Sequence, residues 1–196
     1  SMRAIYLTAD QHAGTGGGQA VVRNELKALQ DLPAEVKVLG GDRPLQYRNV
    51  DIPFLDDHFA ALAMQGPQDL IHCYSGTWTQ SLKLDMGMSP SSYTVPAHNR
   101  RLTVEEFERV HGKDSYPYPH IKDPALWKLF SAGIHMAARV IVPSSHSKEA
   151  LTEEGVPADR LVIIPHGIET IPETVAPFPE QFRVGYLGST GSDKGV

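Results

Sequence analysis

The chain has 196 residues, 41% of them hydrophobic, and a formal net charge of −5. It is therefore long enough to bury a sizeable core, and its slightly acidic balance gives no general electrostatic surface for nucleic acid. A single cysteine, Cys73, excludes an internal disulfide and fits a reducing compartment, so we expect a cytoplasmic protein. The longest apolar runs, such as residues 161–164, are too short to cross a bilayer, and no transmembrane segment is predicted.

The first part of the chain alternates apolar runs with a helical pattern. Residues 3–9 predict a strand that leads into a polar, glycine-rich loop at 10–18. Apolar residues at i, i+4 and i+7 from Val22 predict the helix that follows, and residues 35–39 predict the next strand. Strand, helix and strand in this order form the βαβ unit of a parallel sheet.

The alternation weakens over residues 42–68 and then resumes. In the weaker stretch we expect a helix over residues 58–64 and a short strand over residues 52–55. The later elements are strands at 70–74, 92–97, 139–142 and 160–164, and helices that begin near Thr77, at Asp123–Pro124, and at a capping serine, Ser145 or Ser147.

This pattern predicts an α/β fold, with a Rossmann-like parallel sheet covered by helices on both faces. We assign residues 1–168 to this N-terminal domain, residues 169–181 to a proline-containing linker, and residues 182–196 to the truncated start of a second domain. Because the chain stops after one strand of that domain, strand 182–187 is expected to dock on the first domain, to self-associate with another copy, or to be disordered.

Ligands of such sheets bind at the carboxyl ends of the strands, so polar residues that follow a strand are the candidates. The glycine loop containing Gly17 and Gly18 precedes a helix, where glycines permit close approach and free N–H groups favour an anion. It matches neither a Walker loop nor the dinucleotide fingerprint. A flexible connection therefore remains as open an interpretation as phosphate contact.

Two histidines also follow predicted strands. His98 stands beside Asn99 and Arg100, and His166 is followed by Gly167 before the linker. An imidazole there can donate to a sugar hydroxyl or act as a base, although surface and turn roles are equally open. His72 lies inside a strand and is expected to be a satisfied, half-buried residue.

No metal site is predicted, because the nine histidines form no zinc-binding pair and no Asp-x-Asp sequence exists to hold a metal–nucleotide complex.

Four segments, taken in order, resemble the retaining, nucleotide-sugar-dependent glycosyltransferases of family 4, which have the GT-B fold. The strand leading into Gly16-Gly17-Gly18 is the first, and Val95-Pro96-Ala97-His98 is the second. Residues 160–169, with the sequence RLVIIPHGIE, are similar to the family's segment at the domain junction. Residues 184–196 are similar to the opening strand and loop of its second domain. The resemblance spans the whole chain but covers about half of such an enzyme.

The resemblance implies a hexosyltransferase-type enzyme of carbohydrate biosynthesis that needs no metal and no cofactor beyond its nucleotide-sugar donor. It implies that Gly17, Gly18 and Lys194 bind the donor diphosphate and that His98 is catalytic, stabilising charge near the anomeric carbon. His166, Gly167 and Ser189 are then candidates for the donor or interdomain cleft. Asn99 and Arg100 are candidates for contacting a sugar or glycolipid acceptor.

One departure concerns Ser189, which stands where the family usually has an arginine. Relatives that act on lipid acceptors associate peripherally with membranes, but no basic amphipathic helix in this chain indicates it. For this 196-residue chain alone we expect little or no transfer, because most of the donor site would be absent.

Two alternatives remain open. The first is a non-catalytic Rossmann-like module that binds a sugar or nucleotide. The second, weakened by the glycine register, is a nicotinamide-dependent oxidoreductase.

Overall fold

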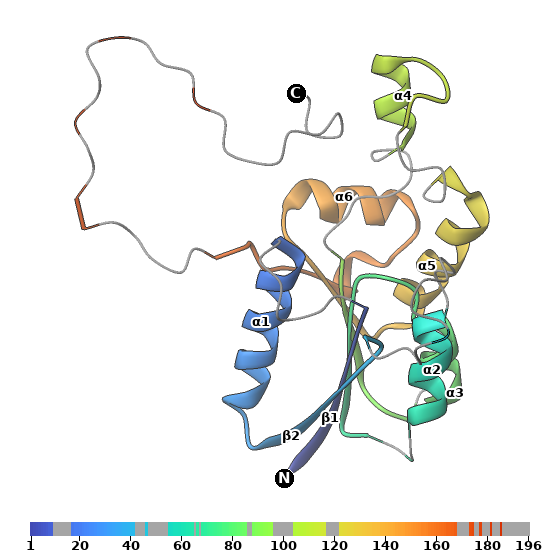
Figure 1. Ribbon diagram of the computed structural model, residues 1–196, viewed down its shortest axis with the longest axis vertical. Helices are drawn as coiled ribbons and strands as arrows, with labels where there is room; N and C mark the ends of the chain where they lie inside the picture. The colour runs from blue at the N-terminus through green and yellow to red at the C-terminus, as the bar shows by residue number, and fades with distance from the viewer. Residues whose placement is uncertain are drawn as a thin grey trace.

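The computed structural model describes most of the first 167 residues and isolated positions after them (Figure 1). The described residues are 1–9, 17–41, 46, 55–64, 66, 68–85, 88–95, 104–116, 122–167, 173–174, 177, 181 and 185. The predicted linker 169–181 and strand 182–187 lie almost wholly outside them, so both stay predictions.

The core of the fold is an open parallel sheet, which confirms the predicted α/β class. Its strand order is β2-β1-β3-β4-β5-β6, and every neighbouring pair is parallel. The strands are β1 Met2–Thr8, β2 Ala34–Leu39, β3 Leu70–Tyr74, β4 Ser91–Thr94, β5 Arg139–Val142 and β6 Leu161–Ile163.

The helices connect these strands in the expected alternation. In the described part of the chain they are α1 Gly17–Gln30, α2 Leu55–Ala63, α3 Thr79–Asp85, α4 Glu106–His111, α5 Pro124–Met136 and α6 Ser145–Glu153, with a short 3₁₀ turn at Ala158–Arg160. None of them combines the length and the hydropathy that a helix needs to cross a membrane.

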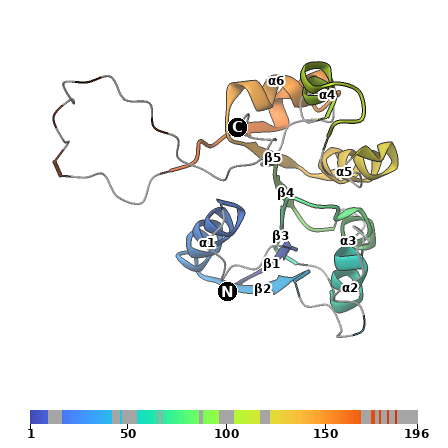
Figure 2. The same cartoon turned by 45° about the horizontal axis from the view of Figure 1, so that its top comes forward.

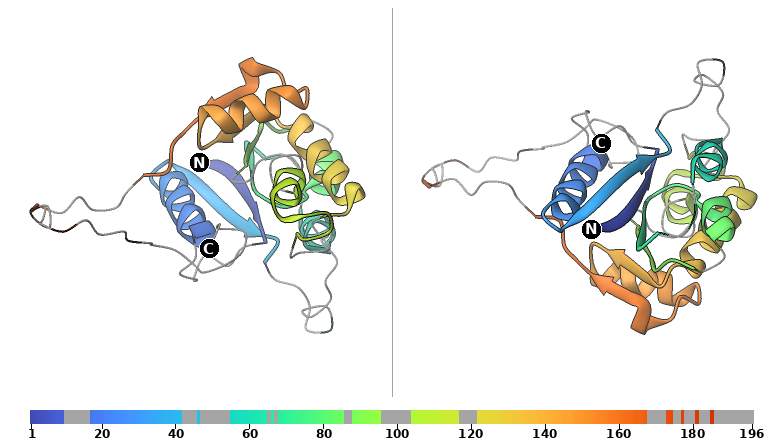
Figure 3. Two further views of the ribbon diagram at one scale, coloured as in Figure 1. Left: turned by 90° about the horizontal axis from the view of Figure 1, so that it is seen from above. Right: turned by 90° about the horizontal axis from the view of Figure 1, so that it is seen from below.

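The order in which successive strands join the sheet reverses at β1, and this reversal distributes the helices unequally between the two faces. β2 pairs with one side of β1, whereas β3 pairs with the other. Because parallel crossovers are right-handed, the helix of the first connection lies on one face and those of the later connections lie on the other. The views along the strands show α1 on one side and α2, α3 and α5 on the opposite side (Figures 2 and 3).

The two faces consequently have different cores. The larger cluster is built on residues such as Ile71, Tyr93 and Val140, and it includes Leu151 of α6. On the other face, Val22 and Leu26 of α1 pack on tyrosines of β1 and β3, and no other described helix joins this cluster. The apolar stripe predicted for α1 from Val22 is therefore confirmed.

The ends of the helices follow from local sequence, with two corrections. Asp123 caps α5 as expected, its carboxylate accepting the N–H of Ala125, and Pro124 occupies the first turn. α6 is capped by Ser144, not by Ser145 or Ser147. Ser144 has an extended backbone, and its hydroxyl accepts the N–H of Ser147 at 3.2 Å.

The start of α2 corrects a further prediction. Leu55 is the first residue of this helix, so the predicted strand 52–55 is wrong at that position, and residues 52–54 lie outside the described part. Asp56 and Asp57 form an acidic first turn, which stabilises the positive end of the helix dipole.

α3 begins at Thr79 rather than near Thr77, because the chain first makes a left-handed turn. Ser75 and Gly76 have φ values of 49° and 70°. The buried carboxylate of Asp57 then accepts the N–H groups of Gln80 and Ser81 at 2.7 and 2.8 Å, which caps α3 from a neighbouring helix.

Trp78 fixes the turns at the carboxyl ends of β2 and β3. Its side chain is 1% exposed, and its indole N–H donates to the carbonyl of Ser75. Gly40, with φ +110°, lies directly against the indole, and a Cβ at this position would stand 2.6 Å from the carbonyl oxygen of Thr8. Only glycine satisfies both the backbone conformation and the packing there.

We predict that Gly40→Ala lowers the free energy of unfolding by about 2–4 kcal/mol, because left-handed strain adds to overpacking. Gly112, with φ +102° and open space around a Cβ, is the matched control. Gly112→Ala should cost only the backbone strain, about 1–2 kcal/mol. Urea unfolding of both variants measures the difference, and equal losses would contradict the packing role of Gly40.

Candidate functional site

A cavity of about 750 Å³ lies between α1 and the part of the sheet that α1 leaves uncovered. Its lining comes from α1, from β3, β4 and β5, and from the segment that follows β6. Much of the wall is aliphatic, as at Val21, Leu29, Ile141 and Ile164. The cavity is consistent with the strand order, because α1 is the only described helix on this face and β3, β4 and β5 extend beyond it.

The cavity brings together two segments that the sequence singled out separately. Gly17 and Gly18 form the start of α1, whereas His166 and Gly167 follow β6, and all four line the same cavity. Each pair lies beyond the carboxyl end of a strand, where ligands of open parallel sheets bind. We call these four residues the mouth of the cavity.

The backbone of the mouth is open to a ligand. A Cβ at Gly17 or at Gly167 would have no other heavy atom within 4 Å. Gly17 is also the first residue of α1, whose free N–H groups and positive dipole end favour an anion. His166 is exposed beside Gly167, so its imidazole is accessible to a bound molecule.

The other predicted site residues are not placed. His98, Asn99, Arg100, Ser189 and Lys194 lie outside the described residues. Their catalytic, acceptor-binding and diphosphate-binding roles therefore stay predictions.

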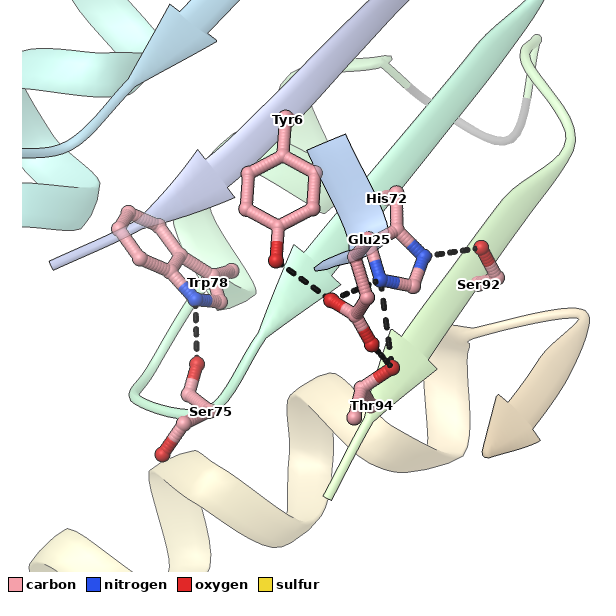
Figure 4. Close-up of polar contacts among 7 residues, drawn as sticks. All are labelled: Tyr6, Glu25, His72, Ser75, Trp78, Ser92 and Thr94. Atoms are coloured by element: carbon pink, nitrogen blue, oxygen red, sulfur yellow. Dashed lines mark hydrogen bonds and ion pairs between the residues drawn. The ribbon is translucent and has the colours of Figure 1, made fainter. Parts of the chain in front are cut away.

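A polar cluster lies deeper in the cavity, where α1 meets the sheet (Figure 4). Oε2 of Glu25 accepts the hydroxyl of Tyr6 at 2.5 Å and lies 3.1 Å from Nε2 of His72. Oε1 of Glu25 accepts the hydroxyl of Thr94 at 2.6 Å. Nδ1 of His72 lies 2.7 Å from the hydroxyl of Ser92. Except for Tyr6, all members of the cluster line the cavity.

The hydrogen bonds of this cluster form one connected chain. Nε2 of His72 faces Oε2 of Glu25 and lies 3.2 Å from the hydroxyl of Thr94, and Nδ1 faces the hydroxyl of Ser92. The prediction that His72 is a satisfied residue is confirmed, and at 6% exposure it is fully rather than half buried.

Glu25 is held in its ionised form by its neighbours. Burial alone would raise the pKa of this carboxyl group. The hydrogen bonds from His72, Thr94 and Tyr6, with the attraction of His72, outweigh that effect and lower the pKa below its ordinary value. The cavity thus contains a carboxylate whose charge is stabilised mainly by hydrogen bonds.

Glu25, Ser92 and Thr94 were not predicted as site residues, although a signal was present. Glu25 falls on the same helical stripe as Val22 and Leu29, where an acidic side chain is unexpected unless it has a buried partner. Residues 92–95, with the sequence Ser-Tyr-Thr-Val, also alternate polar and apolar residues, which is unusual in a parallel strand covered on both faces.

Among the described residues, no group of three or more His, Cys, Asp or Glu side chains is arranged to hold a metal ion. The segments that carry His98 and Lys194 lie outside the described residues.

We predict that Glu25→Gln lowers the free energy of unfolding by about 1–2 kcal/mol at pH 7, because a charge-assisted network loses its charge. A carboxyl group whose pKa is lowered by folding stabilises the fold above its unfolded pKa, and this contribution is lost as the pH falls. The difference between the wild type and the variant should therefore shrink below about pH 4.5, the ordinary glutamate value. Urea unfolding between pH 3 and pH 8 measures it, and a constant difference would contradict the assignment.

Comparison with known proteins gives one partial family match. Residues 96–171 match the model of the family described as Glycosyltransferase Family 4, which is less than half of the chain. A search of curated protein sequences gives no match.

Among solved structures, the chain is similar to the UDP-GlcNAc 2-epimerase from Neisseria meningitidis, determined with UDP-GlcNAc bound. The sequence identity is 13% and the TM-score is 0.44, over 82% of this chain and 44% of the epimerase. The chain thus spans less than half the length of that protein. The segment 96–171, which begins after β4 and includes β5, β6 and the mouth residues His166 and Gly167, is the part that is similar to a glycosyltransferase family.

Proposed function

We propose that the chain is the N-terminal, acceptor-side part of a retaining glycosyltransferase, which moves a sugar from a nucleotide-sugar donor to an acceptor without a metal ion. The observation that carries the proposal is the mouth of the cavity. Gly17 and Gly18 line the same cavity as His166 and Gly167, although the two pairs are distant in the sequence. The partial match to a glycosyltransferase family includes the second pair and supports the same function.

The mouth suits a diphosphate group. Backbone N–H groups at the start of a helix bind phosphate oxygens, and a glycine at Gly17 lets the ligand approach the backbone. Among the described lining residues there is no lysine or arginine. The negative charge of the leaving diphosphate would therefore be met by α1 and by Lys194, the role that the family resemblance implies for that lysine.

His98 is the proposed catalytic residue. Transfer from an activated sugar passes through a state with positive charge near the anomeric carbon, which nearby polar groups stabilise. The resemblance assigns this position to His98, which follows β4 in the sequence. Asn99 and Arg100, the next residues, are proposed to contact the acceptor, and Ser189 to border the donor.

We predict that Gly17→Ala weakens donor binding without destabilising the fold. An added methyl group has open space in this structure, but it would occupy the path of an approaching diphosphate. The KM for the nucleotide sugar should rise about tenfold, a loss of the size of one good hydrogen bond to a charged group. Unfolding should be unchanged or slightly shifted to higher stability, since alanine favours a helix more than glycine does.

The transfer assay uses the protein expressed from its complete reading frame, with the 196-residue chain assayed in parallel. Gly41→Ala is the control, because a Cβ at Gly41 would lie 4.0 Å from the carbonyl oxygen of Thr8, its backbone is not left-handed, and it does not line the cavity. An unchanged KM in Gly17→Ala would contradict the placement of the donor at the mouth.

A second prediction concerns the chemical step. His98→Ala should lower kcat at least about 100-fold, the usual loss when a group that stabilises the transition state is removed. Unchanged turnover would refute the role of His98. If the wild type binds a nucleotide sugar but shows neither transfer nor hydrolysis with any acceptor tested, the chain is the non-catalytic binding module instead.

A further inference from the structure

The deep part of the cavity differs chemically from its mouth. The mouth offers helix N–H groups, which favour an anion, whereas the deep part offers the carboxylate of Glu25. Glu25 follows Gly18 by two turns of α1, and a rise of about 1.5 Å per residue separates them by about 10 Å along the helix axis. A molecule that reaches from one end to the other therefore meets two opposite electrostatic preferences.

The carboxylate of Glu25 is available to the cavity. The side chain of Glu25 is 21% exposed, whereas the side chain of its partner His72 is 8% exposed. Oε2 already has two partners, Tyr6 and His72, whereas Oε1 accepts the hydroxyl of Thr94. A carboxylate oxygen can accept more than one hydrogen bond, so Oε1 has capacity for a ligand donor.

No lysine or arginine among the described residues of the lining offsets the charge of Glu25. The ion-pair partner of Glu25 is His72, whose Nδ1 is engaged by Ser92. Aliphatic side chains such as Val21 and Ile141 line the cavity beside this carboxylate. A charge in such a poorly hydrated cleft attracts a cation more strongly than the same charge on an open surface.

We propose that the deep part of the cavity is a binding subsite for a primary ammonium group carried on an apolar or alicyclic body, with Glu25 as its counter-ion. The ammonium group donates to Oε1 of Glu25, and the hydroxyl of Ser92 and the aliphatic side chains of Val21 and Ile141 surround the body. A neutral hydroxyl in the same place makes a weaker hydrogen bond, and a carboxylate is repelled.

This inference deepens the proposed function and rests on it in one respect: it assigns the acceptor to the amine-bearing sugars or cyclitols. The ammonium group would be held near Glu25 while a hydroxyl of the acceptor lies toward the mouth. The binding subsite itself is independent of any transfer reaction, so the two proposals can fail separately.

The test compares three probes with the same ring and different head groups: cyclohexylmethylamine, cyclohexylmethanol and cyclohexanecarboxylate. Binding to the 196-residue chain is measured by NMR titration at pH 8, where an alkylammonium is charged and a free imidazole is neutral. We expect the amine to bind about tenfold or more tightly than the alcohol, as a charge-assisted hydrogen bond predicts, and the carboxylate to bind weakest. The shifted resonances should include Val21 and Ile141.

The variant Glu25→Gln keeps the size of the side chain and removes its charge. It should abolish the preference for the amine and leave the affinity for the alcohol within about twofold. Glu35→Gln, at an exposed carboxylate of β2 outside the cavity, should leave the preference intact. The folded state of each variant is checked by circular dichroism.

Three results would overturn the proposal: equal affinities of amine and alcohol for the wild type, a preference that survives in Glu25→Gln, or binding that shifts resonances elsewhere. The wild-type series decides the question even if Glu25→Gln does not fold. If the protein selects amines but shows no transfer activity, the proposed function is contradicted and the subsite is supported. If it shows transfer without amine selectivity, the subsite is contradicted and the proposed function is supported.

Discussion

The reversal of strand order at β1 is the constraint on which the rest of this structure depends. β1 is flanked by β2 on one side and by β3 on the other, so right-handed connections place α1 on one face and the later helices on the opposite face. The opposite face becomes an apolar core around Tyr93 and Val140. In the part of the chain that the structure describes, α1 covers only part of its own face, and the cavity lies over the rest.

Glu25 links this architecture to chemistry. A charged side chain on the packing stripe of α1 would destabilise the fold unless the sheet supplied partners, and it supplies three, Tyr6, His72 and Thr94, from three different strands. The same hydrogen bonds fix the position of α1 against the sheet and keep the carboxylate ionised. The same network thus holds α1, with Gly17 and Gly18 at the mouth, in place and gives the deep part of the cavity its carboxylate.

The sequence predicted well those features that depend on local periodicity. The strand–helix alternation, the stripe from Val22 and the cap at Asp123 were all visible in residue spacing. The placement of His166 and Gly167 at the same cavity as Gly17 could also be anticipated, because the carboxyl ends of parallel strands share one edge.

The remaining features depend on contacts between distant segments. Asp57 caps α3 across a helix pair, which no local pattern encodes, so the start of that helix was misplaced. The Glu25 cluster joins residues from α1, β1, β3 and β4, each of which looks like an isolated polar residue in its own segment. The choice of Ser144 over Ser145 as a cap depends on which serine is the last residue with an extended backbone before the helix begins.

The proposed function requires the sugar donor and acceptor to meet in the cavity under α1. This can be measured by amide hydrogen exchange of the protein from its complete reading frame, with and without a saturating nucleotide sugar. The donor should slow exchange together in the first turns of α1 and in residues 164–167, which contain the mouth residues, and leave α2 and α3 unchanged. Protection that appears on α2 and α3 and is absent from both mouth segments would contradict it.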